Sequence, residues 1–139
     1  MDYQTFVTQQ LIPRVLAALN NLKSNLVTAG VVANKITVAE VTTEGVNDLR
    51  YRITATRGAK TLTGYIELTA AGIINGAMGL VLTLHLDGNG VTIPLSFTSG
   101  ASVAYNETSG IDFLLSKLSQ IETVTVGELL TATKTFLGV

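Results

Sequence analysis

The sequence predicts an α+β fold, with an antiparallel sheet of about four to five strands, an N-terminal helix and one or two C-terminal helices. Apolar residues recur every three or four positions near both ends of the chain, which is typical of helices with one buried face. Between them, residues 49–69 and 80–98 alternate apolar and polar side chains on either side of a glycine-containing turn. This second pattern indicates two strong β-hairpins.

The N-terminal helix is predicted from a single apolar stripe. Pro13 suits its first turn, where the N–H that proline lacks would have no partner. Residues 3–11 should therefore form a separate turn or a kinked extension, and Gly30 suits the end of the helix. A weaker strand is expected at residues 36–42. The stripe consists of Val15, Leu16, Leu19, Leu22 and Leu26.

The first hairpin has a predicted register. A two-residue turn at Gly58-Ala59 places oppositely charged or apolar residues across from one another. A slip by one residue would mix the two faces of the sheet, so this register is specific. The expected pairs are Arg50 with Glu67, Arg52 with Tyr65, Tyr51 with Ile66, and Leu49 with Leu68.

The second hairpin is predicted around a turn at residues 87–90. Because proline cannot donate a hydrogen bond to a neighbouring strand, Pro94 indicates an edge strand. An exposed edge can pair with another chain. The expected apolar pairs are Leu86 with Val91, Leu84 with Ile93, Leu82 with Leu95, and Leu80 with Phe97.

The segment between the hairpins, residues 70–78, is rich in glycine and apolar residues. It is too short for a good helix and too apolar for an ordinary loop, so we expect it to contact the core or a neighbouring molecule. Residues 68–86 carry no formal charge and are long enough to span a membrane. Asn75, Thr83 and His85 interrupt this stretch, and its second half alternates like a strand, so we favour a strand.

The C-terminal part is predicted to follow a loop at residues 99–108. Ser109 and Asp112 form a capping box that opens a helix, and Thr125 and Glu128 form a second box that opens another. The apolar stripe of the first helix is Ile111, Leu114, Leu115, Leu118 and Ile121. The residues after the second box are Leu129, Leu130, Thr133, Phe136 and Leu137.

Composition favours a single domain over residues 1–139 with a weakly charged surface. Only 14% of the residues are charged and twenty are threonine, so copies repel one another weakly and self-association is favoured. Nine basic and ten acidic residues without a run of one sign argue against a nucleic-acid partner. Asp2, with no basic region before an apolar run, argues against a secretory signal. We expect a cytoplasmic protein, or a virion component if it is viral.

Catalytic, cofactor and metal sites are not expected. Cysteine is absent and His85 is the single histidine, which excludes zinc motifs and histidine pairs within one chain. His85 is expected on a surface strand near Asp87. An enzyme would have to assemble its groups from Arg50, Arg52, Glu67, His85 or Asp87, and no motif supports that arrangement.

These observations favour a non-enzymatic structural subunit of a larger homo- or hetero-oligomeric complex, such as a neck, tail or capsid-associated protein of a tailed-phage virion. The expected partners are copies of itself or other protein subunits, with no nucleic acid and no membrane. The alternative is a cytosolic chaperone-like or small-ligand binding module. The interface is predicted to include Ile73, Ile74, Met78, Ile93, Leu95 and Phe97.

Overall fold

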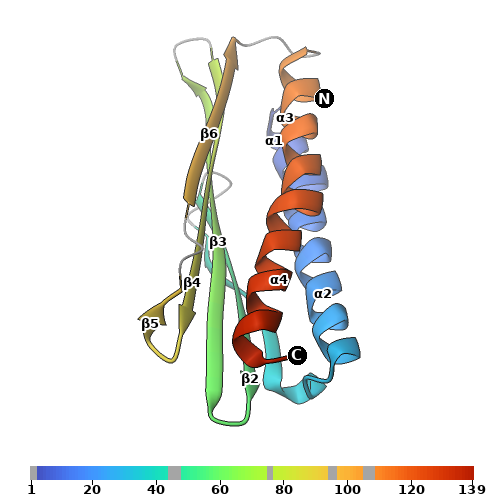
Figure 1. Cartoon of the computed structure of the whole chain (residues 1–139). Helices are drawn as coiled ribbons and strands as arrows, with labels where there is room; N and C mark the ends of the chain where they lie inside the picture. The colour runs from blue at the N-terminus through green and yellow to red at the C-terminus, as the bar shows by residue number, and fades with distance from the viewer. Residues whose placement is uncertain (1–2, 44–47, 75–76, 94–96, 105–108) are drawn as a thin grey trace.

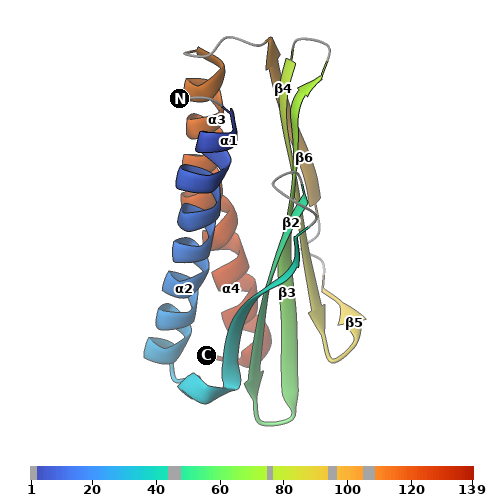
Figure 2. The ribbon, with the colours of Figure 1, turned by 180° about the vertical axis from the view of Figure 1, so that it is seen from behind.

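A computed structural model describes residues 3–43, 48–74, 77–93, 97–104 and 109–139. Two layers make up the fold, an antiparallel sheet and a pair of long helical segments that cover one of its faces (Figures 1 and 2). The α+β prediction is therefore confirmed. Six strands are present along the described residues, in the order β1-β2-β3-β4-β5, with β6 also paired to β4.

The N-terminal helical segment runs through α1 (Tyr3–Phe6), the π turn η1 (Val7–Leu11) and α2 (Ile12–Ala29). The π turn ends two residues before Pro13, and its wider geometry accommodates the missing N–H and the proline ring. This is the predicted extension. Gly30 ends the helix with φ 115°, a left-handed conformation that favours glycine. The buried residues of α2 are Val15, Ala18, Leu19, Leu22 and Leu26.

The 3₁₀ turn η2 (Ala33–Lys35) leads into β1 (Ile36–Thr43), which is the predicted weaker strand. β2 (Asp48–Arg57) and β3 (Lys60–Ile74) form the first hairpin around the Gly58-Ala59 turn. All four predicted pairs are confirmed: Arg50 with Glu67, Arg52 with Tyr65, Tyr51 with Ile66, and Leu49 with Leu68.

The glycine-rich segment belongs to the sheet. β3 continues to Ile74, and β4 (Ala77–Gly88) pairs with it from Ile74–Ala77 to Leu62–Gly88, with an irregularity between Ala70 and Gly72. The two hairpins predicted as separate units are therefore joined by a third one. Strand structure at residues 68–74 and 77–86 also agrees with the preference for a strand over a membrane span.

The predicted register of the second hairpin is wrong. β5 (Val91–Thr92) pairs Val91 with Gly88 around a two-residue turn at Asn89-Gly90. Both turn residues have positive φ, 51° and 79°, as the favoured hairpin turn requires. The prediction places four residues in this turn, whereas the structure has two, so the register of the hairpin is shifted.

The strand that follows is also interrupted. β6 (Phe97–Ala104) pairs Phe97 with Leu84 instead of Leu80, and its residues replace the first part of the predicted 99–108 loop. β6 has one partner, β4, so it is an edge of the described sheet, as Pro94 led us to expect. Pro94 and Leu95 themselves lie outside the described residues.

The C-terminal helical segment is continuous through α3 (Ser109–Gln120), the π turn η3 (Ile121–Thr125) and α4 (Val126–Leu137). The predicted second capping box is therefore wrong. Thr125 has helical angles, φ −66° and ψ −48°, and makes no capping hydrogen bond. It is buried within the helix, because the apolar face formed by Ile121, Val126 and Leu129 passes through the π turn without a break.

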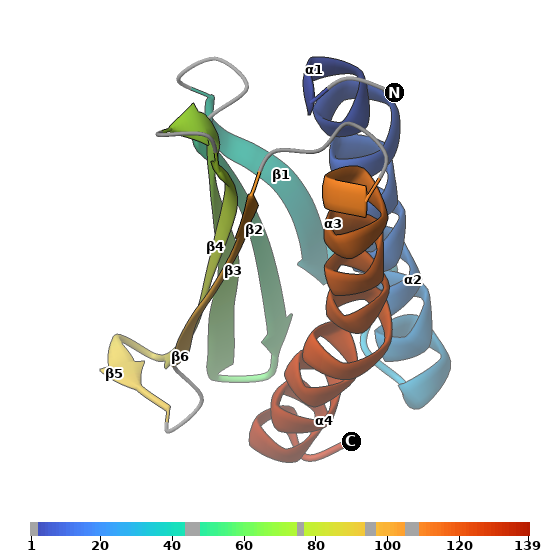
Figure 3. The ribbon, with the colours of Figure 1, turned by 90° about the horizontal axis from the view of Figure 1, so that it is seen from above.

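The core lies between the sheet and the helices, which lie on the same side of it (Figure 3). Gly64 permits a close approach there, since a Cβ at this position would lie 2.7 Å from Leu86 and 3.0 Å from Leu129 of α4. The inward residues of β2 to β4 are Tyr51, Ile53, Ala55, Leu62, Ile66, Leu84 and Leu86, all buried.

The β2–β3 turn also holds the end of α4. Arg57 Nη1 donates a hydrogen bond of 2.8 Å to the carbonyl of Leu137, and Lys60 Nζ donates one of 3.1 Å to the carbonyl of Phe136. These carbonyls belong to the last helical turn, where they lack helical partners and carry partial negative charge. Two cations from the hairpin thus satisfy the C-terminus of the helix.

Candidate functional site

One candidate site is the sheet face that the helices leave uncovered. Alternation along β2, β3 and β4 places Arg50, Glu67, Tyr65, His85 and Asp87 on it. Arg50 Nε donates a hydrogen bond of 2.8 Å to Glu67, and its guanidinium lies 5.4 Å from the Tyr65 ring centroid. The Tyr65 and His85 rings are 5.2 Å apart, and His85 Nε2 lies 3.1 Å from Asp87 Oδ2.

This network contains four of the five residues that an enzyme would have had to recruit. The fifth, Arg52, lies opposite Tyr65 on the same face and is exposed. The side chains of His85 and Asp87 are 23% and 37% exposed, so water reaches this pair. Neither of the two cavities described below is lined by these residues. An open polar face with tyrosine and arginine suits protein contact, since these types are enriched at interfaces.

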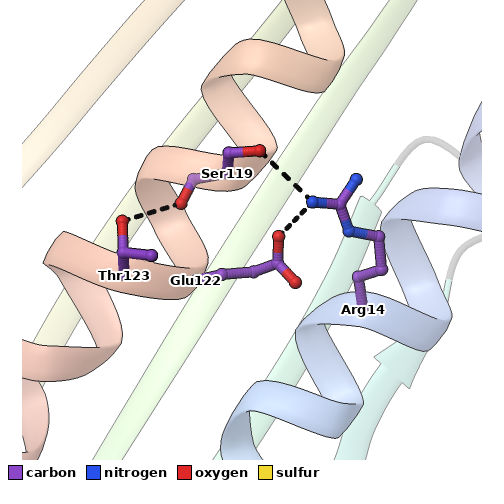
Figure 4. A network of polar contacts seen from close by, with 4 residues as sticks. All are labelled: Arg14, Ser119, Glu122 and Thr123. Atoms are coloured by element: carbon purple, nitrogen blue, oxygen red, sulfur yellow. Dashed lines mark hydrogen bonds and ion pairs between the residues drawn. The ribbon is translucent and has the colours of Figure 1, made fainter.

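A second polar network joins the two helical segments (Figure 4). Arg14 of α2 forms an ion pair with Glu122 of η3 and donates a hydrogen bond of 3.3 Å to Ser119 Oγ. Thr123 Oγ1 donates to the carbonyl of Ser119 at 2.9 Å, within the same helix. Because both charges of the ion pair are satisfied by each other, we assign this network to holding the helices together.

An apolar groove of about 790 Å³ follows α4 on the side of β5. Its walls come from η3, from α4 and from Ile93, which follows β5. The Phe136 ring packs against the sheet here because Gly88 has no side chain: a Cβ would lie 2.5 Å from Cε2 of Phe136. Among the groove residues, Val124 is 55% exposed. The lining of the groove includes Ile93, Val124, Glu128, Ala132 and Phe136.

A smaller cavity of about 230 Å³ lies between α2 and the η3–α4 segment. Asn21 and Asn25 line it from α2, and Glu122 and Val126 line it from the other helical segment. Its lining is more polar than that of the groove, and it is positioned beside the Arg14 network. This cavity shows which side of α2 faces α4.

The predicted interface residues are spread over both ends of the sheet. Ile73 pairs with Met78 beside Ile74, at the end of the β3–β4 hairpin far from the Asn89-Gly90 turn. Phe97 begins β6, and Leu95 lies outside the described residues. Ile93 is half-buried, and its N–H donates a hydrogen bond of 3.0 Å to the carbonyl of Leu86. Ile93 is the predicted residue that the structure places in the groove.

The sequence analysis missed the α4 side of the groove. Val124 lies outside the core stripe of its helix, and Glu128 and Ala132 follow it at four-residue intervals, so all three lie on one helix face. A valine just outside the core stripe of the helix is the sequence signal that could have revealed this side of the groove. The predicted stripe of one helix ends at Ile121 and the next helix is predicted to open at Thr125, so Val124 is assigned to neither.

Tyr51 is a buried titratable group in the core. Its hydroxyl has no hydrogen-bond partner within the described part of the chain, and the residue is 1% exposed. Burial raises the pKa of the Tyr51 hydroxyl above its ordinary value of 10.0, and the negative charge of Glu40, its neighbour on β1, raises it further. The hydroxyl therefore stays neutral at physiological pH and has no evident chemical role.

The described residues contain no cluster of three or more histidine, aspartate or glutamate side chains that could hold a metal ion. Over the same residues, no helix combines the length and apolar character needed to cross a bilayer. Comparison with protein-family models, with curated proteins and with solved structures finds no match. The fold and its surfaces thus define a two-layer α+β protein with an open sheet face and an apolar groove.

Proposed function

We propose that this protein is a non-enzymatic subunit of a larger homo- or hetero-oligomeric assembly. The groove along α4 carries the proposal, because it is apolar, open to solvent and about 790 Å³ in volume. Concave and mainly apolar surfaces of this volume are typical of binding sites. Burial against another subunit would remove the groove from water.

Two further features support an assembly role. Only 14% of the residues are charged, so electrostatic repulsion between copies is weak. The described sheet also has open edges at β1, β5 and β6, where backbone groups are free to pair with another chain. The proposal includes the setting inferred from composition, a neck, tail or capsid-associated position in a tailed-phage virion.

The absolute mass in solution tests this proposal. Size-exclusion chromatography with light scattering, repeated over protein concentration and salt, should give a fixed multiple of 14.6 kDa. High salt should leave that multiple intact, because burial of apolar surface is not screened by ions. A single monomeric mass at every concentration would contradict self-assembly.

The alternative function is a cytosolic chaperone-like or small-ligand binding module. The groove volume supports it, since ligand pockets commonly enclose about 300–1,000 Å³. A monomer that binds an apolar fluorescent dye, and loses that binding in Ala132→Trp, would favour this alternative. A fixed oligomer whose groove takes up no dye would favour the assembly role.

A further inference from the structure

The flank of α2 that faces away from α4 carries two exposed valines, with a half-buried lysine and an exposed lysine beside them. Val27 is 40% exposed, and Val32, just after the helix, is 62% exposed. Lys23 lies one helical turn before Val27 on the same face, and Lys35 follows in η2. We refer to Lys23, Val27, Val32 and Lys35 as the α2 flank.

The α2 flank and the groove lie on opposite sides of the molecule. Seen from above, α4 lies between α2 and β5 (Figure 3). The side of α2 that faces α4 is marked by Asn21 and Asn25 in the smaller cavity. Val27 is separated from these residues around the helix, and from the buried Leu26 as well. The flank of one copy therefore cannot reach its own groove.

The two surfaces also match in apolar character. The groove is concave, and apolar residues such as Val124, Ala132 and Phe136 line it. Val91 extends the same apolar side at β5 and is 69% exposed. The α2 flank offers two exposed valines. Burying these exposed valine side chains against the groove is favourable because it removes apolar surface from water.

The charges of the α2 flank and of the groove are also complementary. α2 and η2 contain no acidic residue. Because Arg14 is paired with Glu122, Lys23 and Lys35 supply the positive charge of the flank. Glu128 is an exposed carboxylate in the groove lining. Opposite charges at the rim of an interface steer association and fix its orientation. Lys23 or Lys35 of one copy would meet Glu128 of the next.

We infer that copies of this chain assemble head to tail, with the α2 flank of one copy seated in the α4 groove of the next. This inference rests on the proposed function and specifies its partner and geometry. Different surfaces meet in such a contact, so it repeats from copy to copy and closes into a ring when the rotation between copies allows. Two copies alone would leave one groove and one flank unfilled.

Two single substitutions test the geometry. Val124→Glu places a charge in the groove and Val27→Glu places one on the flank, and each should reduce the light-scattering mass to that of a monomer. Equal amounts of the two variants should then form a dimer and nothing larger, because Val124→Glu retains its flank and Val27→Glu retains its groove. A symmetric contact between identical surfaces could not produce this rescue.

The control is Ser116→Glu, which adds the same charge to an exposed position of α3 that lines neither surface. It should keep the mass of the unmodified protein. Circular dichroism should show unchanged helix content in all three variants, since both valines are exposed. A variant that fails to fold would lose helix content in this measurement. Charge exchanges at Glu128, Lys23 and Lys35 provide a second test, in which one charged side chain replaces another.

The charge exchange is Glu128→Lys combined with Lys23→Glu or Lys35→Glu. Glu128→Lys alone should shift assembly to higher concentration, and one of the two combined variants should shift it back. Absence of recovery in both would overturn the predicted charge contact.

The outcomes separate this inference from the proposed function. A monomeric unmodified protein contradicts self-assembly and with it the inference. An oligomer that survives both Val124→Glu and Val27→Glu leaves the assembly role intact and overturns the head-to-tail contact. An oligomer that is lost in both variants but does not recover as a dimer on mixing also overturns it.

Discussion

Replacing Tyr51 by phenylalanine should stabilise the fold. The Tyr51 ring packs in the core, whereas its hydroxyl is buried without a hydrogen-bond partner among the described residues. A buried polar group without a partner costs about 1–3 kcal/mol of desolvation. Phenylalanine keeps the ring and removes that cost, although it leaves a space the size of one oxygen atom. We expect the free energy of unfolding to rise by about 1 kcal/mol.

The same substitution should change the alkaline stability. Folding raises the Tyr51 pKa above 10.0, so above pH 10 the unfolded state loses this proton more readily than the folded state. Below pH 10 both states keep this proton, so its ionisation does not affect stability. As the pH rises from 10 toward the folded-state pKa, the unfolded state loses the proton first and the free energy of unfolding falls. At pH 11 the unfolded state is mostly ionised, whereas the folded state keeps more of this proton, so part of the stability is lost. Tyr51→Phe lacks this ionisation, so its advantage over the unmodified protein should grow between pH 9 and pH 11.

Urea unfolding at pH 7, 9 and 11, at one protein concentration, measures both effects. Tyr65→Phe is the matched control, since Tyr65 is half-exposed on the open sheet face. It should alter stability by less than about 0.5 kcal/mol at pH 7. A destabilised Tyr51→Phe protein at pH 7 would show that the hydroxyl has a partner. An advantage that does not grow between pH 9 and pH 11 would refute the pKa argument.

Three further substitutions follow from the packing, each measured by urea unfolding. Gly64→Ala should cost about 2 kcal/mol, because its Cβ would lie 2.7 Å from Leu86. Gly127→Ala should instead add about 1 kcal/mol, since it is helical and has nothing within 4 Å of the new Cβ. Arg57→Ala should cost roughly 0.5–1 kcal/mol by exposing the carbonyls that end α4.

The two glycine variants serve as controls for each other. Equal effects would mean that the close approach at Gly64 does not determine its cost. For Arg57→Ala, the loss should be accompanied by reduced hydrogen-exchange protection in the last turn of α4. Unchanged protection there would contradict the capping role.

Local patterns predicted the elements that depend on neighbours in sequence. The Val15 to Leu26 stripe forms the buried face of α2, and Gly30 ends that helix as expected. The first hairpin has its predicted register because a two-residue turn and face alternation together fix it. These features follow from backbone geometry and the separation of apolar from polar side chains, both of which operate over short distances.

Other elements depended on long-range contacts. Residues 70–74 and 77–78 extend β3 and β4 because pairing satisfies their backbone groups, a gain that glycine content alone does not reveal. Thr125 has the sequence of a helix start, yet the helix continues through it because the face around Ile121 and Leu129 packs on the sheet. Tertiary burial outweighed the local capping preference there.

The two candidate surfaces also differ in how far the sequence could predict them. Alternation places Arg50, Glu67 and His85 on one sheet face, so their grouping follows once the strands are paired. The groove arises differently. It forms because α4 packs over β3 while the sheet extends beyond it to β5, so Phe136 and Ile93 meet across a gap of more than forty residues in sequence.

The amino-acid sequence alone established the α+β class, the N-terminal helix and the register of the first hairpin, because these arise from periodicity and turn chemistry within about twenty residues. The tertiary structure decided the length of β3 and β4, the continuity of the C-terminal helix and the position of the groove. Each of these depends on how the helical layer sits on the sheet. That placement is set by the burial of residues distant in sequence, which no local pattern encodes.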